Sequence, residues 1–542
     1  MSGVNQLTRA VYRWRLLVAL GLAIAVVAIG RNGSFVAGGA DSYCYISEAA
    51  LWLGGNLHVR HDAMVRAPWP NAADAFAPLG YIPARTGAHI VPVHAPGLPL
   101  LMAGAQLVGG RCAMFWVVPL LGGVLVLATY AIGARVGRPI VGLAAAWLVA
   151  TSPAVLVMLA NPMSDLPAAA AWALAVACVL GPGRRSAFAA GLAAAVGILI
   201  RPNLVPVAGP FVLYTLYRDA TTRPRALPRM LTPWFLAAVS IGIIIEGAVN
   251  ASLYGSPFVS GYGRLDYSLT HVWPNLRAQV HWLSSTQTPL VLFGILSLAL
   301  PLRRVWTTPA ARRTLWFLAL YAASVWVPFL LFTVNDAWWY LRYLLPMWPV
   351  IMLGTAACLA ALYRTRWWWA RLVVVLTVVA LGWHGWAEAG RRGAFDVKAG
   401  EQKYIDAAEV VKGRTAPESA VLSVQHSGSV RYYAGRMTLR WDAFPRGYLD
   451  QAVEWLNARG HRPYLLVEPW EVELFRARFG ESDVVGRLDW APVVELDAAS
   501  TVYLYDLADR TRQRGETEVI RTKHLPPGDQ CLEPARPLPF NW

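Results

Sequence analysis

Residues 97–110, GLPLLMAGAQLVGG, decide how the rest of this chain is threaded. The segment is apolar but holds about 14 residues, whereas a helix that crosses a bilayer needs about 20. If it did cross, the basic loop with Arg135 and Arg138 would lie outside, and every later loop would change sides. We therefore predict a re-entrant or juxtamembrane helix that begins and ends on the same side of the membrane.

The other apolar segments predict an α-helical polytopic membrane protein over residues 1–390, with about eleven transmembrane helices. Of the 542 residues, 56% are hydrophobic and 15% are charged, compared with about 25% charged in soluble domains. Basic clusters then fall on one side at every turn, so we expect a multi-pass protein of the plasma (inner) membrane with a cytoplasmic N-terminus. The predicted spans are residues 16–30, 113–134, 140–159, 166–180, 187–200, 203–217, 233–253, 289–302, 315–334, 343–363 and 368–386.

The charge and cysteine content exclude other classes. The net charge of +16 does not indicate nucleic-acid binding, because the basic residues lie in short clusters between apolar runs, as the positive-inside rule predicts. The cysteines are scattered, with neither metal-ligand spacing nor a disulfide framework. They are Cys44, Cys112, Cys178, Cys358 and Cys531.

Residues 395–508 alternate helical and strand-like segments, which predicts a small C-terminal α/β domain, extracytoplasmic in this topology. Residues 493–496 and 501–505 are expected to close it as a hairpin. Its polar cluster at 425–429 is either a binding loop or, more simply, a turn with a helix cap. We expect this domain to cover the membrane site or to help select the acceptor. Residues 509–542 are expected to form a poorly ordered tail.

The first external loop, residues 31–96, begins with a stretch that carries carboxylates. Residues 40–52, ADSYCYISEAALW, predict a short helix in which Asp41, Tyr45, Glu48 and Trp52 share one face. Carboxylates on one face of a helix at the mouth of a membrane protein indicate a site at the water–lipid boundary. The alternative is a solvated face of an interfacial helix.

Further charged residues are predicted to meet that helix on the outer side. Charged groups beside hydrocarbon are costly, so a functional role is the default interpretation, and arginine binds phosphate well. Helix capping by the aspartates and snorkelling by the arginines are the alternatives. The residues are His94 in the loop 89–97, Asp165 in the turn 161–167, and Arg201 and Arg342 at the outer ends of spans.

Two weaker candidates lie on a later span and on the loop after it. Glu246 and Asn250 are four residues apart near the outer end of a span, where they either face a substrate or form an interhelical hydrogen bond. Tyr262, Arg264 and Asp266 in the loop 254–285 are candidates for contact with a donor.

Five short motifs, taken in order, resemble the polytopic GT-C glycosyltransferases, with the protein-mannosyltransferase and aminoarabinose-transferase branch nearest. The resemblance covers roughly residues 15–365 and implies transfer of a sugar from a polyprenyl-phosphate carrier to an acceptor outside the cytoplasmic membrane. It also implies that Asp41 is the base or the acceptor-orienting residue. Family members often have two adjacent acidic residues here, whereas Ser42 follows Asp41. The motifs are ADSYCYISEAALWLGG (40–55), HAPGLPLLMAG (94–104), NPMSDLP (161–167), RPN (201–203) and RYLLP (342–346).

The chemistry of such a transfer assigns the candidates. A base must take the acceptor proton and cations must stabilise the departing phosphate, so we expect Asp41 as base, with Arg201 and Arg342 holding the phosphate. Asp165 is the second catalytic candidate, and Glu48, His94 and Tyr343 complete the substrate-binding set. No metal ligands and no certain cofactor are predicted, and a divalent cation is left open.

The expected partners are a polyprenyl-phosphate-linked sugar, an extracytoplasmic acceptor (glycan, lipid or protein) and membrane lipid, with no nucleic acid. Two other functions stay open. One is a transporter or flippase for a lipid-linked sugar, which should show inverted repeats and broken, charge-lined spans near the midplane. The other is a non-enzymatic membrane sensor.

Overall fold

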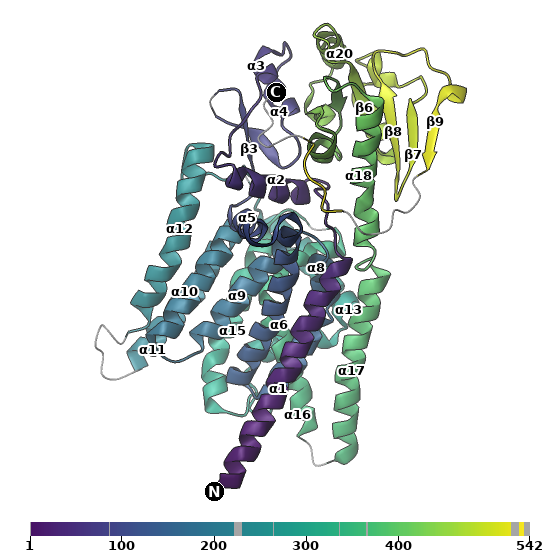
Figure 1. Cartoon of the computed structure of the whole chain (residues 1–542). Coiled ribbons are helices and arrows are strands. Elements are labelled where there is room, and N and C mark those ends of the chain that lie inside the picture. Colours follow the sequence, from purple (N-terminus) through teal and green to yellow (C-terminus); the bar gives the residue numbers. More distant parts are fainter. Residues whose placement is uncertain are drawn as a thin grey trace.

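Most of the first 390 residues form a bundle of helices, and two smaller units, the first external loop and a C-terminal unit, cover one end of it (Figure 1). The computed structural model describes residues 2–85, 87–221, 230–263, 265–334, 336–364, 367–521 and 530–535. Among them, seven helices are long and apolar enough to cross a membrane, or eight if one bent pair counts as a single span. The seven are Trp14–Asn32, Arg111–Val136, Gly183–Ile200, Thr232–Tyr254, Pro309–Leu331, Trp338–Tyr363 and Trp368–Arg391.

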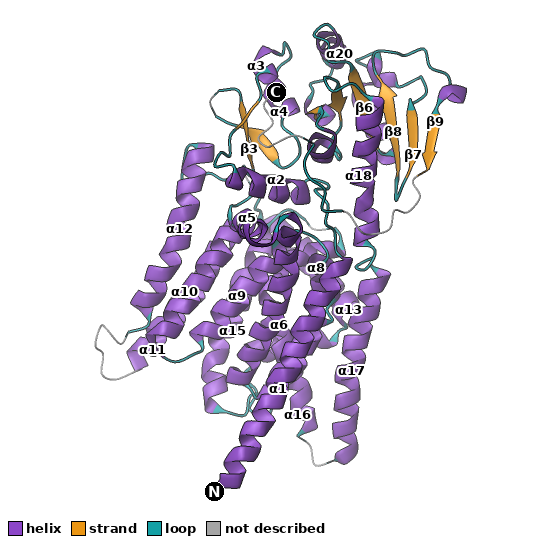
Figure 2. Cartoon of the chain, in the orientation of Figure 1, coloured by secondary structure: helices purple, strands orange, loops and turns teal. Residues whose placement is uncertain are grey.

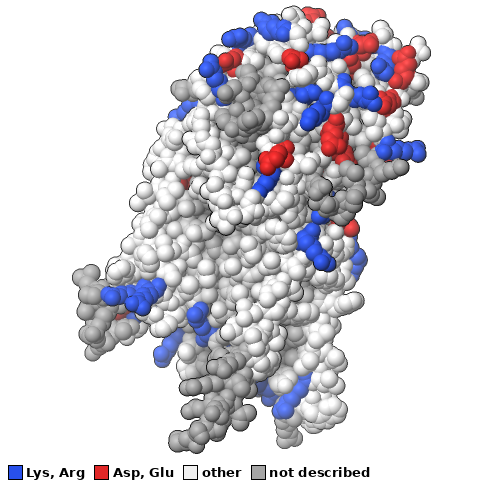
Figure 3. All heavy atoms as spheres, in the orientation of Figure 1, with Lys and Arg blue, Asp and Glu red and all other residues white. Residues whose placement is uncertain are grey.

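The distribution of charge agrees with a multi-pass membrane protein. On the face shown in Figure 3, the band between the two ends is nearly free of charged side chains. The end that holds the N-terminus shows Lys and Arg, whereas the opposite end carries both signs. The bundle helices are α1 (Ser2–Ile29), α6 (Val117–Val136), α7 (Pro139–Ala150), α8 (Pro153–Leu159), α9 (Asp165–Val179), α10 (Gly183–Ile200), α11 (Ala208–Thr221), α12 (Thr232–Tyr254), α13 (Val272–Gln287), α14 (Leu290–Ala299), α15 (Pro309–Leu331), α16 (Trp348–Tyr363) and α17 (Trp368–Arg391).

Three of the eleven predicted spans, α9, α11 and α14, are helices shorter than 18 residues. Helix α9 is almost completely buried and packs between α6 and α10, so its length is matched to its neighbours rather than to the bilayer. The structure supports seven or eight spans by length and composition, and the figure of eleven stays a prediction.

The predicted span 140–159 is broken rather than straight. Helices α7 and α8 meet at an angle of 59°, because Ser152 is extended and precedes Pro153, which disfavours helical geometry in the residue before it. The predicted loop 254–285 likewise contains α13, which packs against α15.

The decisive apolar segment forms α5 (Gly97–Gly109), which lies across the end of the bundle beside α2 (Asp41–Leu53) (Figure 1). It is too short to span, as predicted, and Val108 near its end is 93% exposed. Gly97 has a specific role, because a Cβ there would lie 2.5 Å from the backbone nitrogen of Ile200 at the end of α10. The segment therefore fits as a juxtamembrane helix tied to α10.

The first external loop is an ordered unit that contains α2 and a three-stranded antiparallel sheet of order β1-β3-β2. In Figure 2 every strand drawn lies at the end of the molecule opposite the N-terminus. The loop elements are η1 (Gly30–Asn32), β1 (Val59–Arg60), α3 (Ala63–Arg66), α4 (Ala72–Phe76), β2 (Tyr81–Pro83), β3 (His89–Pro92) and η2 (Arg111–Trp116).

The C-terminal unit is a mixed six-stranded sheet of order β5-β4-β6-β8-β7-β9 with helices packed on it. The hairpin predicted at 493–505 is confirmed, with Asp497 opposite Thr501. The sheet continues past residue 508, because β9 pairs with β7. Its elements are α18 (Val397–Arg414), β4 (Ala420–Leu422), α19 (Ser427–Ser429), η7 (Val430–Ala434), β5 (Met437–Leu439), η8 (Trp441–Ala443), α20 (Leu449–Asn457), β6 (Pro463–Val467), α21 (Pro469–Phe479), η9 (Val485–Arg487), β7 (Val494–Asp497), β8 (Thr501–Asp506), η10 (Arg514–Glu516) and β9 (Glu518–Arg521).

One cysteine prediction is wrong, because Cys112 and Cys531 form a disulfide across a sequence separation of 419 residues. The tail around it is packed: Gln530 accepts a hydrogen bond from the Phe35 nitrogen, and the Ala535 nitrogen donates to the carbonyl of Tyr432. No spacing rule connects two cysteines so far apart, so only the fold reveals the pair. The described part of the predicted tail thus joins the bundle to the C-terminal unit.

The C-terminal unit packs on the first external loop and shares a hydrophobic core with it. Arg431 donates to the carbonyl of Phe76 at 2.9 Å, and the Leu79 nitrogen donates to Ser427 Oγ at 3.1 Å. The cluster at 425–429 is therefore a turn and helix start that holds the loop, which supports the simpler of its two interpretations.

Candidate functional site

A cavity of about 1030 Å³ lies where the start of α2, the segment before α5 (residues 93–95) and the loop after α12 meet the bundle. Six of the seven predicted site residues line it, and they come from segments far apart in the sequence. Glu48 is the exception. The six are Asp41, His94, Asp165, Arg201, Arg342 and Tyr343.

Each charged residue lies at the end of a helix or in a short irregular helix. Asp41 is the first residue of α2, and Gly39, with φ of +56°, turns the chain just before it. Asp165 is the first residue of α9. Arg201 follows α10 in an extended conformation that Pro202 favours, and Arg342 belongs to η6 (Trp338–Met347).

The carboxylates and guanidinium groups are paired unequally. Asp165 and Arg201 form a direct, largely buried ion pair. Asp41 is held more loosely, with Arg342 Nη1 3.8 Å from its Oδ2 and His94 Nε2 3.4 Å from its Oδ1. Asp41 therefore keeps an accessible carboxylate edge at the cavity, whereas Asp165 is committed to its partner.

Aromatic side chains fix the orientation of these charges. The guanidinium carbons of Arg201 and Arg342 each lie 5.2 Å from the ring centroid of Tyr343, within cation–π range. The ring of Tyr45 stacks on His94 at 4.2 Å between centroids. Tyr343 thus holds both guanidinium groups on one side of the cavity.

His94 is anchored from two directions. Its Nδ1 and the Tyr262 hydroxyl are hydrogen-bonded at 2.6 Å, which leaves Nε2 turned toward Asp41. Tyr45, below the imidazole, donates to Ser164 Oγ at 2.8 Å. The sequence interpretation assigned no role to Tyr45 or Ser164, although both lie in the quoted motifs.

The environment of Asp41 keeps it ionised. Burial by itself raises the pKa of this carboxyl. The hydrogen bond and charge of His94, with the charges of Arg342 and Arg201, outweigh burial and lower the pKa to about 2. Asp41 is consequently an anion throughout the physiological pH range and can accept a hydrogen bond from a substrate hydroxyl.

Glu48 is fully buried on α2 behind the cavity rather than solvated. The Trp52 indole donates to its Oε1 at 3.1 Å. Burial raises the pKa of Glu48 well above its usual range, against the lowering effect of that hydrogen bond. The carboxylate face predicted for α2 therefore exists but is packed inside the protein, and no solvated face forms.

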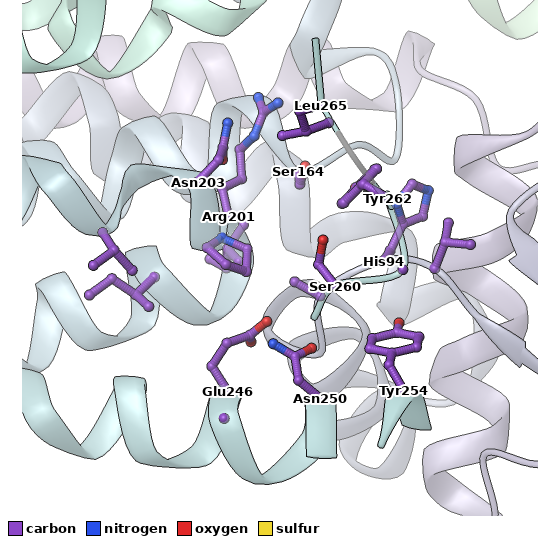
Figure 4. A pocket seen from close by; sticks show the side chains of 18 of the residues that line it. His94, Ser164, Arg201, Asn203, Glu246, Asn250, Tyr254, Ser260, Tyr262 and Leu265 are labelled. Atoms are coloured by element: carbon purple, nitrogen blue, oxygen red, sulfur yellow. Dashed lines mark hydrogen bonds between the residues drawn. The ribbon is translucent and has the colours of Figure 1, made fainter. Parts of the chain in front are cut away.

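The weaker candidates separate into two groups. Glu246, Asn250 and Tyr262 line the cavity, and their side chains point into it (Figure 4). Asp266 is exposed in an ion pair with His271 and does not line it. Arg264 lies outside the described residues.

One wall of the cavity is apolar and open. Ile243 and Ile244 of α12 contribute to it with Val205, and Ile244 is 67% exposed. Phe258, in the loop after α12, is 95% exposed beside them. A charged interior beside an open hydrocarbon wall suits an amphiphilic ligand.

The cavity does not provide a metal site. Within the described ranges, no group of three or more His, Cys, Asp or Glu side chains could hold a metal ion. The donor set explains this, because the Asp165 carboxylate is paired with Arg201 and the Asp41 carboxylate already contacts Arg342 and His94. The residues present therefore do not fit the divalent cation that the sequence left open.

Comparison with solved structures identifies the fold. ArnT from Cupriavidus metallidurans, bound to undecaprenyl phosphate, superposes with a TM-score of 0.52 at 14% identity over 90% of this chain and 97% of that one. The oligosaccharyltransferase AglB from Archaeoglobus fulgidus, in complex with an inhibitory peptide and a dolichol-phosphate, gives 0.53 at 11% identity over 90% and 74%. No protein-family model and no curated protein sequence matches the chain. The chain thus has the fold of these GT-C enzymes, as the motifs predicted.

Proposed function

We propose that this protein is a membrane glycosyltransferase that moves a hexosyl or pentosyl group from a polyprenyl-phosphate donor to an acceptor outside the cytoplasmic membrane. One observation carries the proposal: Asp41, Asp165 and two guanidinium groups line a single cavity with an open apolar wall. The fold shared with enzymes solved with polyprenyl-phosphate lipids supports it.

The donor would be bound by its two chemically different ends. Its phosphate would lie at Arg342 and Arg201, whose positive charge also stabilises the phosphate as it leaves. Its prenyl chain would run along Ile244 and Phe258, which already expose hydrocarbon. The sugar is thereby held between the arginines and Asp41.

Asp41 would accept the proton of the acceptor hydroxyl as that oxygen attacks the anomeric carbon, and the bond from that carbon to the phosphate oxygen breaks. A carboxyl with a pKa near 2 is a weak base in the empty site. The donor's phosphodiester, a monoanion, would offset part of the positive charge of Arg342 and Arg201 and would thereby raise the pKa of Asp41. Donor binding therefore makes Asp41 a stronger base when it is needed.

Asp165 would act through Arg201, since their ion pair fixes the guanidinium beneath Tyr343. His94 orients Asp41 from the other side. Both are positioning residues in this scheme.

The site would face the extracytoplasmic side of the plasma membrane. The Cys112–Cys531 disulfide lies at this end, and disulfides persist in oxidising compartments. The basic residues at the opposite end support a cytoplasmic location for that end, by the positive-inside rule. This orientation keeps the eleven-span topology of residues 1–390 as the working arrangement.

The test combines genetics with the purified protein. A strain that lacks the gene should lose a defined modification of a surface glycan, lipid or protein, detected by mass spectrometry. Wild-type protein should restore it and Asp41→Asn should not, while both accumulate equally in the membrane. The matched control is Asp74→Asn, the same change at an exposed position of the same loop. Full restoration by the Asp41→Asn variant would refute the proposal.

A further inference from the structure

We infer that Glu246 and Asn250 of α12, backed by Glu48 of α2, form a subsite that recognises hydroxyl groups on the sugar ring of the donor. This inference rests on the proposed function. It assigns the part of the cavity that the phosphate and the attacking hydroxyl do not use.

The two α12 side chains are placed for contact with a ligand. Glu246 lies two helical turns before the end of α12 at Tyr254, or about 12 Å along the axis. Asn250 is one turn further on, and both side chains point into the cavity and toward one another (Figure 4). A carboxylate this far inside an apolar span is costly, and such residues mark substrate sites by default.

The carboxyl groups are incompletely satisfied. Glu246 is 7% exposed and Glu48 is 0% exposed. In each, Oε2 is buried and has no hydrogen-bond partner among the described residues. If Glu246 served only to bond a neighbouring helix, that bond would satisfy its Oε2. Because Oε2 is unsatisfied, we infer that a ligand supplies the hydrogen-bond donor. A buried acceptor without a hydrogen bond destabilises the protein unless a ligand supplies the donor.

The balance of charge selects the chemistry of that donor. Burial holds Glu48 neutral by raising its pKa, and the neighbouring charge of Glu246 acts in the same direction. With Glu48 uncharged behind the cavity, the subsite needs no cation, and a neutral hydroxyl donor can satisfy Glu246, which lines the cavity. A phosphate is attracted by Arg342 and Arg201, so the ligand is ordered with its phosphate at the arginines and its ring at α12.

The amide of Asn250 extends the recognition. It offers two N–H donors and one acceptor beside the Glu246 carboxylate, so the pair can bind adjacent ring hydroxyls with opposite hydrogen-bond roles. A site built in this way rejects rings that lack the matching hydroxyl, because its own polar groups would then stay unpaired.

The experiment compares two kinds of lipid on the same protein. Full-length protein in lipid nanodiscs is titrated with undecaprenyl phosphate and with synthetic undecaprenyl-phosphoryl glucose, galactose, mannose and arabinose. We expect wild type to bind at least one sugar-bearing lipid about tenfold more tightly than undecaprenyl phosphate. Glu246→Gln and Asn250→Ala should abolish that gain without changing the Kd for undecaprenyl phosphate. Ser240→Ala, a change at a half-buried position of the same helix that does not line the cavity, should behave as wild type.

The arms separate the two proposals. Retention of the full gain by both variants overturns the subsite, as does a wild type that prefers none of the sugar-bearing lipids. If wild-type protein does not bind undecaprenyl phosphate, the proposed function is overturned instead. A variant that merely misfolds lowers the affinity for every lipid in the series. In that case Glu48→Gln, which changes only the buried partner, provides a second measurement of the affinity gained from the sugar.

Discussion

Replacement of Arg342 should weaken binding of the lipid phosphate more than replacement of any other residue that lines the cavity. Its partners are weak: Nη1 lies 3.6 Å from the sulfur of Met163, and Nη2 lies 3.5 Å from the hydroxyl of Tyr343. Its Nε is buried and has no hydrogen-bond partner among the described residues. Arg342 therefore has more donors available for a phosphate than Arg201, whose Nη1 is engaged by Asp165.

The magnitude follows from the bonds that a phosphate would add. A hydrogen bond to a charged group contributes about 1.5–3 kcal/mol, and each 1.4 kcal/mol is about tenfold in Kd. Arg342→Gln should thus raise the Kd for undecaprenyl phosphate by roughly 10- to 100-fold. Arg342→Lys, which keeps the charge but loses the planar fork, should fall between this variant and wild type.

The assay is equilibrium binding of undecaprenyl phosphate to the protein in nanodiscs, with thermal unfolding measured in parallel. Arg66→Gln, an exposed arginine on α3, is the matched control. Arg201→Gln should instead lower the unfolding temperature, because it leaves Asp165 buried without its partner, a loss of about 3–5 kcal/mol for a buried pair. A wild-type Kd in the Arg342→Gln variant would show that the phosphate does not bind where the charges converge.

Three further predictions use other parts of the structure. His94→Gln should raise the pKa of Asp41 from about 2 toward its ordinary value. Because activity is lost when Asp41 is protonated, the acid limb of the pH profile of kcat/KM should then move to higher pH. An unmoved acid limb would exclude the contact between His94 and Asp41. Cys112→Ser should free the tail and lower the free energy of unfolding by about 2–4 kcal/mol, measured by thermal or urea unfolding with Cys178→Ser as control; equal stability would mean that the disulfide is not formed. Gly97→Ala should separate α5 from α10, which should lower the free energy of unfolding by about 1–3 kcal/mol and also lower the rate of sugar transfer. Gly104→Ala, on the same helix but with open space around it, should change neither quantity. Similar behaviour of the two variants would contradict the packing.

Local sequence patterns predicted the elements that carry the site. The period of apolar and polar residues predicted α2, and the short length of α5 excluded it as a span. The patterns could not predict the break at Ser152, because an apolar run of that length reads as a continuous helix despite Pro153. They also missed α13, whose sequence is too polar to resemble a span.

The partners of individual side chains were beyond the reach of the sequence. Asp165 was predicted as a catalytic candidate, but its ion pair with Arg201 depends on how α9 and α10 pack together. Glu48 was expected at the substrate surface, but the rotation of α2 buries it behind the cavity. The same holds for Cys112 and Cys531, which nothing in their spacing connects.

The sequence by itself determined the membrane class, the order of the helices and the small set of charged residues beside hydrocarbon, because hydrophobicity and charge act locally along the chain. Only the tertiary structure decided which charges pair, which carboxyl is buried, and that one apolar wall opens beside them. These depend on contacts between residues tens to hundreds of positions apart. Their geometry is set by helix packing, and no pattern along the chain records it.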